Sequence, residues 1–142
     1  MNRETIYTAL AAKLTAALSG TSTVSRRMLH WFDVPPSQQP AVFICSGGQV
    51  DQQTTGMPTI RHLLAEVWVY ANTTDPAAAP ETILNNILDL IDTALKPTTG
   101  AQKQTLGGLV DHCWVDGPIV TDEGTLGSQG VAKFSIKMLT TL

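Results

Sequence analysis

The fold is decided by residues 59–71, which read TIRHLLAEVWVYA. Alternate positions fall on two faces, one with His62, Leu64, Glu66, Trp68 and Tyr70, the other with Leu63, Ala65, Val67 and Val69. The second face is wholly apolar, and the β-branched and aromatic side chains favour an extended chain. Residues 61–66 alone also fit a helical pattern. We predict a long strand whose apolar face points into the core.

Two amphipathic helices are predicted, one before this strand and one after it. In residues 3–18, apolar side chains recur every four residues at Ile6, Leu10, Leu14 and Leu18. After a turn-rich loop over residues 72–80, a broad apolar stripe is formed by Ile83, Leu84, Ile87, Leu88, Ile91 and Leu95. Ser19 and Gly20 end the first helix, and Pro97 ends the second.

Four further strands complete the predicted sheet, at residues 24–32, 40–45, 109–120 and 131–139. Gly47-Gly48 is expected to form a bulge or bend, and Gly117-Pro118 to break the third of these strands. The last strand alternates polar and apolar side chains, which is typical of a half-buried antiparallel strand. The element order predicts an α+β fold, a mainly antiparallel mixed sheet of about five strands with two helices packed on it (α-β-β-β-α-β-β).

The composition argues against two classes of protein. The chain has 142 residues, of which 43% are hydrophobic and 15% charged, with a formal net charge of −3. Such a hydrophobic fraction is not that of a disordered tail, and the acidic balance argues against a basic nucleic-acid-binding domain. The length fits one domain spanning residues 1–142. Charged residues usually make up about a quarter of a domain, so the low charge content suggests that a partner covers some of the surface.

The sequence predicts a soluble protein made in the cytoplasm, without a membrane partner. Glu4 and Lys13 interrupt the apolar residues near the N-terminus, so no signal-peptide core of the needed length remains. No run approaches the roughly 18 apolar residues of a membrane helix. Cys45 and Cys113 each lie in an apolar run and are expected to pack as small hydrophobic side chains.

The sequence predicts no catalytic, cofactor or metal site, and therefore no enzyme. His112 and Cys113 are adjacent, so on a strand they point to opposite faces and do not ligate one metal. The chain has no Cys-x-x-Cys or His-x-x-x-His pair. Residues 124–130 are rich in glycine but lack the Gly-Lys-Ser/Thr ending of a phosphate loop, and a hairpin loop is expected there. Asp89 and Asp92 are expected to be solubilising residues on the outer side of the second helix.

The positive features of the sequence concern surfaces. Three polar loops of low charge, at residues 49–59, 98–105 and 121–129, suit contact with other proteins, and exposed strand edges invite pairing with another subunit. Arg26 and Arg27 are neighbours on a predicted strand and are expected to face opposite ways. One hypothesis is that one of them pairs with an acidic residue of a neighbouring subunit. The alternative is an ordinary exposed charge at the edge of the sheet.

Several segments, taken in order, carry a resemblance to a known family. After the first amphipathic helix they are QPAVFI at 39–44, LAEVWVY at 64–70, LNNILDLIDTAL at 84–95, LGGLVDHCWVDG at 106–117 and GVAKF at 130–134. With them the chain resembles the small tail-terminator (tail-completion) proteins of long-tailed bacteriophages, including the minor tail protein U group. The resemblance covers nearly the whole chain in element order and length, and its motifs are structural.

The resemblance implies a structural protein of the virion tail and neck, made in the host cytoplasm. Such proteins form a homo-hexameric ring on the tail tube, end tube polymerisation and offer a surface to the head-completion (connector) proteins. Genome DNA passes through the channel without specific binding. Six copies at −3 each give the ring a net charge of −18, which suits a channel that does not hold DNA. The family carries over no catalytic residues.

The resemblance also implies that loops at the sheet ends contact the tube or a neighbouring subunit. Here those loops are residues 49–57 and 121–129, matched by position only. The candidate contact residues are Gln49, Asp51, Gln52, Met57, Asp122, Glu123 and Gln129.

Two alternative functions stay open from the sequence. A head–tail adaptor or stopper of the neck shares the same partners and differs in the ring that it touches. A small α+β enzyme or ligand-binding domain needs a pocket with converging polar groups. A deep, polar-lined pocket around His62 or His112 would favour that second alternative.

Overall fold

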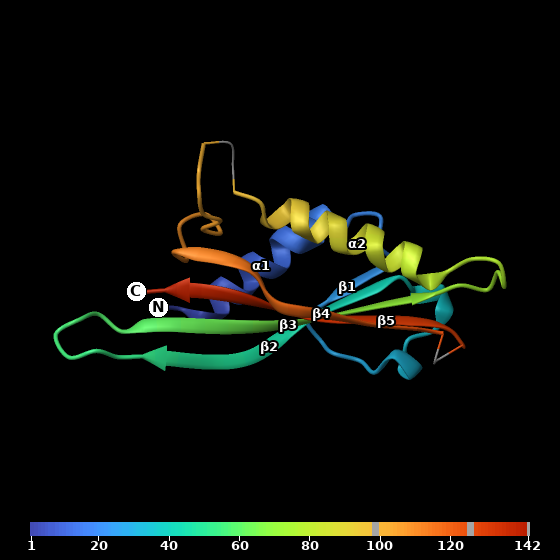
Figure 1. The fold of residues 1–142 in the computed structure, drawn as a ribbon, viewed down its shortest axis with the longest axis horizontal. Coiled ribbons are helices and arrows are strands. Elements are labelled where there is room, and N and C mark those ends of the chain that lie inside the picture. The colour runs from blue at the N-terminus through green and yellow to red at the C-terminus, as the bar shows by residue number, and fades with distance from the viewer. Residues whose placement is uncertain (98–99, 125–126, 142) are drawn as a thin grey trace.

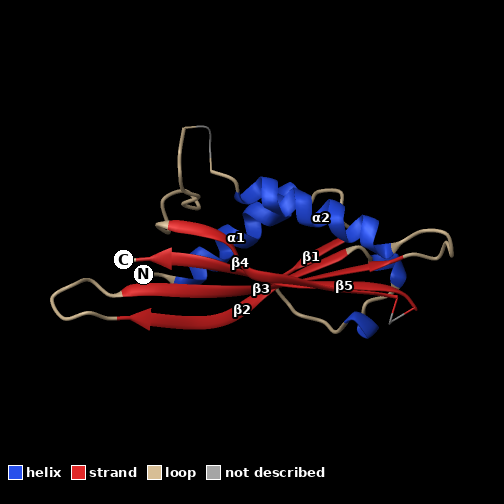
Figure 2. Cartoon of the chain, in the orientation of Figure 1, coloured by secondary structure: helices blue, strands red, loops and turns tan. Residues whose placement is uncertain are grey.

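The computed structural model describes residues 1–97, 100–124 and 127–141, and within them the chain forms two α-helices, two short 3-10 helices and five strands. The helices are α1 (Arg3–Ala17), η1 (Trp31–Asp33), η2 (Pro36–Gln38) and α2 (Pro80–Leu95). The strands are β1 (Thr23–Ser25), β2 (Ala41–Gln52), β3 (Ile60–Asn72), β4 (His112–Gly124) and β5 (Gly127–Thr140). The order α-β-β-β-α-β-β confirms the predicted α+β fold (Figure 1 and Figure 2).

The strands form one mixed sheet in the order β1-β2-β3-β5-β4. β1 runs parallel to β2, and the other neighbouring pairs are antiparallel. β3 therefore lies in the middle, and its alternating burial confirms the two predicted faces. We call the face with Leu63, Ala65, Val67 and Val69 the helix-covered face, and the face with His62, Leu64, Glu66, Trp68 and Tyr70 the helix-free face.

Both α-helices pack on the helix-covered face (Figure 1). They contribute to one core cluster the buried side chains Ile6, Leu10, Leu14, Leu84, Ile87, Ile91 and Leu95. From the sheet this cluster receives Val67 and Val69 of β3 together with Phe134 and Ile136 of β5. Full burial of one such side chain contributes about 1.5–3 kcal/mol, so the main stabilising contacts of the protein lie on this face.

Residues 26–40 cross one end of the helix-free face. The predicted strand at 24–32 is therefore wrong over most of its length. Only Thr23–Ser25 pairs in the sheet, and Trp31 belongs to the 3-10 helix η1. The physical reason is packing: Trp31 lies against a second apolar cluster that includes Phe43 and Tyr70, on top of the sheet and not in line with it.

β2, β4 and β5 extend past their predicted ends. The expected loop at 121–129 is therefore wrong wherever it is described, whereas residues 49–52 of the expected loop at 49–59 belong to β2 and its remainder is a loop as expected. β2 continues to Gln52, past the predicted bulge, which is confirmed by a register shift between Ser46 and Gly48. β4 begins at His112 and passes the Gly117-Pro118 break as another shift of register. Polar side chains at the strand ends suggested loops. Strand pairing depends on hydrogen bonds between backbone groups, however, and these continue through the polar residues. Residues 98–99 and 125–126 of the expected loops lie outside the described residues.

Candidate functional site

An apolar groove of about 620 Å³ lies on the helix-free face. Its lining consists of Met28, His30, Trp31, Trp68, Tyr70, Val120, Asp122, Val131 and Lys133. The strand register makes its floor, because Trp68, Lys133 and Val120 are opposite one another on β3, β5 and β4. Tyr70, Val131 and Asp122 form the next row in the same way. Two rows across three strands thus give a flat floor of mostly apolar side chains.

The wall of the groove is the segment from Met28 to Trp31, and Tyr70 holds it in place. The Tyr70 hydroxyl donates a hydrogen bond to the Leu29 carbonyl at 2.8 Å. The Tyr70 ring packs against Phe43, with ring centroids 5.5 Å apart. Burial raises the pKa of Tyr70 to about 12, so the hydroxyl stays protonated and keeps donating at neutral pH.

Large apolar side chains around the groove are exposed. Val120 on the floor is 60% exposed, Met28 on the wall is 36% exposed, and Phe32 beside the wall is 77% exposed. On the floor, the Lys133 Nζ lies 4.9 Å from the centre of the Trp68 ring and 4.0 Å from Glu66 Oε1. Contiguous exposed apolar surface of this kind marks a site of interaction with another molecule. The groove is therefore a candidate docking surface.

A second hollow of about 530 Å³ lies on the same face, nearer the β2–β3 hairpin. We call it the polar hollow because more polar and charged side chains line it than line the groove. It is lined by Val50, Gln52, His62, Leu64, Asp116, Gly117, Pro118, Ser135 and Lys137. Lys137 Nζ lies 3.0 Å from Asp116 Oδ2, and its hydrogen bond holds the pKa of that carboxyl below the usual range. Trp114 Nε1 donates to the other carboxylate oxygen at 3.2 Å. The charges of this hollow are thus paired with each other.

The histidines of this region differ in their partners. His62 lines the polar hollow, and its Nδ1 atom is buried without a hydrogen-bond partner among the described residues. His112 is held within the chain, since its Nδ1 accepts from the Gln104 backbone N–H at 3.1 Å and its ring stacks on Trp114. The hollow beside His62 is the kind of feature that a ligand-binding domain needs, but its lysine and aspartate already bind each other.

Within the part of the chain that the structure describes, no group of three or more His, Cys, Asp or Glu side chains can hold a metal ion. Burial raises the pKa of the Cys113 thiol to about 12 and also raises that of Cys45, which is half-buried. Both shifts favour the protonated thiol at neutral pH. Across the same residues, no helix is long and apolar enough to cross a membrane.

The candidate contact residues on the β2–β3 side lie mostly on a strand, and all but the half-buried Gln49 are exposed. Gln49, Asp51 and Gln52 belong to β2, and only Met57 lies in the connection, where it is 65% exposed. The Gln49 side chain accepts a hydrogen bond from Arg3 Nε at 2.6 Å. Of these four residues, Gln52 lines the polar hollow, and none lines the apolar groove.

The candidate contact residues on the β4–β5 side divide into two kinds. Asp122 lines the apolar groove, and its neighbour Glu123 has its pKa raised by a hydrogen bond with Glu81. The expected exposed position of Gln129 is wrong, because this side chain is only 3% exposed. It exchanges two hydrogen bonds of 2.9 Å with the side chain of Gln39, and this pair ties residues 34–39 to the sheet.

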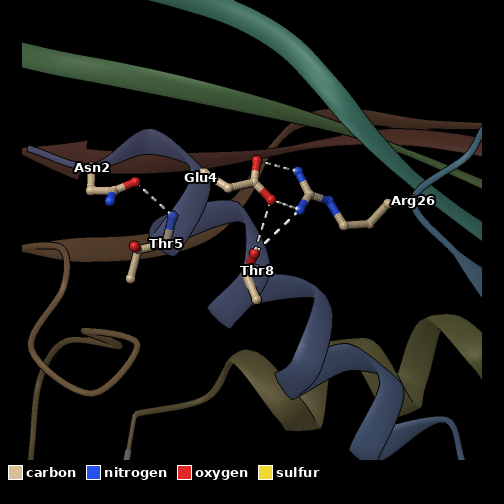
Figure 3. A network of polar contacts seen from close by, with 5 residues as sticks. All are labelled: Asn2, Glu4, Thr5, Thr8 and Arg26. Atoms are coloured by element: carbon tan, nitrogen blue, oxygen red, sulfur yellow. Dashed lines mark hydrogen bonds and ion pairs between the residues drawn. The ribbon is translucent and has the colours of Figure 1, made fainter.

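Arg26 and Arg27 follow the end of β1, so their expected position on a strand is wrong. Arg26 pairs with Glu4 at the start of α1 and also donates to Thr8 at 3.3 Å, as Figure 3 shows. The hydrogen bond that Arg26 donates to the Glu4 carboxylate holds the pKa of Glu4 below its usual range. Arg26 is therefore engaged within the chain. Pairing of the exposed Arg27 with a neighbouring subunit stays a prediction.

The groove-forming residues Met28, Trp31 and Val120 were not predicted as a site. A usable signal was the run Met28-Leu29-His30-Trp31-Phe32, which is too crowded with large apolar residues for an exposed loop and lacks strand alternation.

In comparisons with known proteins, no family model and no curated protein matches the chain.

Proposed function

We propose that this protein is a structural assembly protein of a long-tailed bacteriophage. It forms a ring on the end of the tail tube, stops tube polymerisation and presents the surface to which head-completion proteins join. The resemblance of the sequence to tail-terminator proteins motivates the proposal. The structural observation that supports it is the exposed apolar groove on the helix-free face, because a sheet with one open apolar face is suited to binding another protein.

A ring of identical subunits places a further demand on the surface. Each contact in such a ring is heterologous, so every subunit needs two different patches that fit each other. The apolar groove around Trp68 on the helix-free face is the candidate for one of these two patches. The net charge of −3 per chain also suits a channel through which DNA slides.

The proposal is tested by assembling tails with and without this protein and measuring tube lengths in negative-stain electron micrographs. We expect uniform tubes with the protein and longer tubes of variable length without it. Val120→Asp places a charge on the groove floor and is expected to abolish length control, whereas Leu90→Asp on the outer side of α2 is expected to preserve it. Tube lengths that do not depend on the protein would contradict the proposal.

The neck adaptor or stopper is distinguished by its binding partner. A pull-down of tube protein and of portal-side proteins with the immobilised chain separates the two functions. Retention of tube protein supports a tail terminator. Retention of portal-side proteins alone would assign the chain to the neck instead.

A further inference from the structure

The β2–β3 hairpin extends beyond the rest of the sheet (Figure 1). Its connection forms a tight turn, in which the Met57 backbone N–H donates to the Thr54 carbonyl at 2.9 Å and Gly56 has a φ of +78°. Gly56 accepts this left-handed conformation without strain. The turn leaves Met57 65% exposed at the end of the hairpin.

This hairpin tip can be buried at low cost. Residues 52–60 read QQTTGMPTI and contain no charged side chain, so covering them desolvates no charge. Met57 is the large apolar side chain that the tip exposes. A methionine adapts to irregular apolar hollows and makes favourable contacts between its sulfur and aromatic rings.

The apolar groove matches the chemistry of this tip. Three aromatic rings line it, those of Trp31, Trp68 and Tyr70, and its volume of about 620 Å³ leaves room for a methionine and part of a turn. Its charged side chains, Asp122 and Lys133, have opposite signs and add no net charge. An uncharged, methionine-bearing tip therefore fits this groove better than a charged segment does.

The tip and the groove of one chain cannot meet. The hairpin joins β3 at Ile60, whereas the groove lies at Trp68 and Tyr70 farther along the same strand. From Ile60 to Trp68 the strand spans about 27 Å. Only another copy can bring its tip to this groove, and such a head-to-tail contact forms a ring when the rotation between copies closes.

We propose that the β2–β3 hairpin of one copy, with Met57 at its tip, docks into the apolar groove around Trp68 of the next copy. The inference rests on the proposed ring and specifies its subunit contact. We expect the protein alone to associate through this contact at high concentration.

Disulfide cross-linking of purified protein tests this contact in a Cys45→Ser background, in which Cys113 stays buried. A mixture of Met57→Cys and Val120→Cys chains is expected to give a 57–120 cross-link, identified as a linked peptide by mass spectrometry. The double variant is expected to give a ladder of oligomers, since each copy then has both ends of the contact. The matched control, Met57→Cys mixed with Leu90→Cys, is expected to give no 57–90 cross-link.

A second measurement uses sedimentation of variants that change exposed positions of the same hairpin. Met57→Ala is expected to weaken self-association by at least about tenfold, because it removes the side chain at the centre of the contact. Thr55→Ala shortens an exposed side chain of the same turn without adding a charge and is expected to weaken it clearly less.

The outcomes separate this inference from the proposed function. Wild-type protein that stays monomeric when concentrated, or that associates without a 57–120 cross-link, overturns the contact and leaves the tube-capping proposal standing. Tube lengths that are independent of the protein overturn the tube-capping proposal, whatever the cross-linking shows. Equal effects of Met57→Ala and Thr55→Ala would also overturn the assigned role of Met57.

Discussion

The two faces of the sheet are built by the same strands and differ completely in what covers them. On the helix-covered face, Val67 and Ile136 are 0% exposed and Phe134 is 2% exposed beneath α1 and α2. On the helix-free face, Val120 is 60% exposed, and a groove and a hollow open beside it. Neighbouring residues of one strand therefore have different roles. The covered face stabilises the fold, and the open face is left to bind another molecule.

The helix-free face is not open throughout, because residues 34–39 cover one of its ends. Residues 34–39 are fastened there by the Gln39–Gln129 amide pair and by a hydrogen bond from Gln39 to the Val34 carbonyl at 3.0 Å. Polar contacts fasten this cover in addition to the apolar packing of Val34 and Trp31, whereas the helices are held mainly by apolar contacts. The uncovered remainder, around Val120 and Lys137, is therefore a distinct surface and not an incomplete core.

The largest expected effect separates the two faces by stability. Leu10→Ala removes a side chain that is 0% exposed between α1 and the sheet, and is expected to lower the free energy of unfolding by about 2–5 kcal/mol. Val120→Ala on the open face is expected to change it by less than about 0.5 kcal/mol. Urea unfolding measures both values. Similar losses for the two variants would break the comparison between the faces.

The next effect concerns the polar fastening of the covered end. Gln129→Ala leaves the buried amide of Gln39, which is 8% exposed, without its partner and is expected to cost about 1–3 kcal/mol. A double-mutant cycle with Gln39→Ala isolates the pair, and the double variant is expected to lose less than the sum of the single variants. Strictly additive losses in urea unfolding would show that the two amides do not act together.

A smaller effect is expected at the groove wall. Tyr70→Phe removes the hydrogen bond to the Leu29 carbonyl and is expected to cost about 0.5–1.5 kcal/mol in unfolding free energy. Tyr7→Phe is the matched control, because the Tyr7 hydroxyl donates to the Leu64 carbonyl at 2.7 Å, away from the groove. Both variants are expected to lose similar stability, but only Tyr70→Phe is expected to weaken self-association in sedimentation. Equal effects on association would contradict a role of the wall in binding.

The sequence predicted the helix-covered face well because burial there has a local period. The alternation in residues 59–71 and the four-residue spacing of Ile6, Leu10 and Leu14 each depend on one element facing one core. The element order followed from these patterns and is confirmed. No knowledge of distant contacts was needed for either face of β3.

The helix-free face was harder to predict because distant residues create it. Trp68 was placed on the correct face of its strand, but its groove needs β5 between β3 and β4, and a single sequence does not specify strand order. Trp31 was assigned to a strand because its apolar neighbours resemble one, whereas packing on Phe43 and Tyr70 decides its position. Gln129 looked like a loop residue, and its burial follows from its place on β5 and its pairing with the distant Gln39.

The smallest expected effect lies in the polar hollow and depends on pH. The hydrogen bond from Lys137 lowers the pKa of Asp116 in the folded chain below the unfolded value of about 3.9. The ionised pair therefore contributes stability above that value, and the contribution is lost as the pH falls through the folded pKa. Because Asp116 is 37% exposed, solvent screens the pair, and Asp116→Asn is expected to cost less than about 1 kcal/mol at pH 7. Unfolding free energies at pH 7 and pH 3 are expected to show the difference between variant and wild type shrinking at pH 3. A difference that is the same at both pH values, or as large as that of Leu10→Ala, would place a main stabilising contact on the open face.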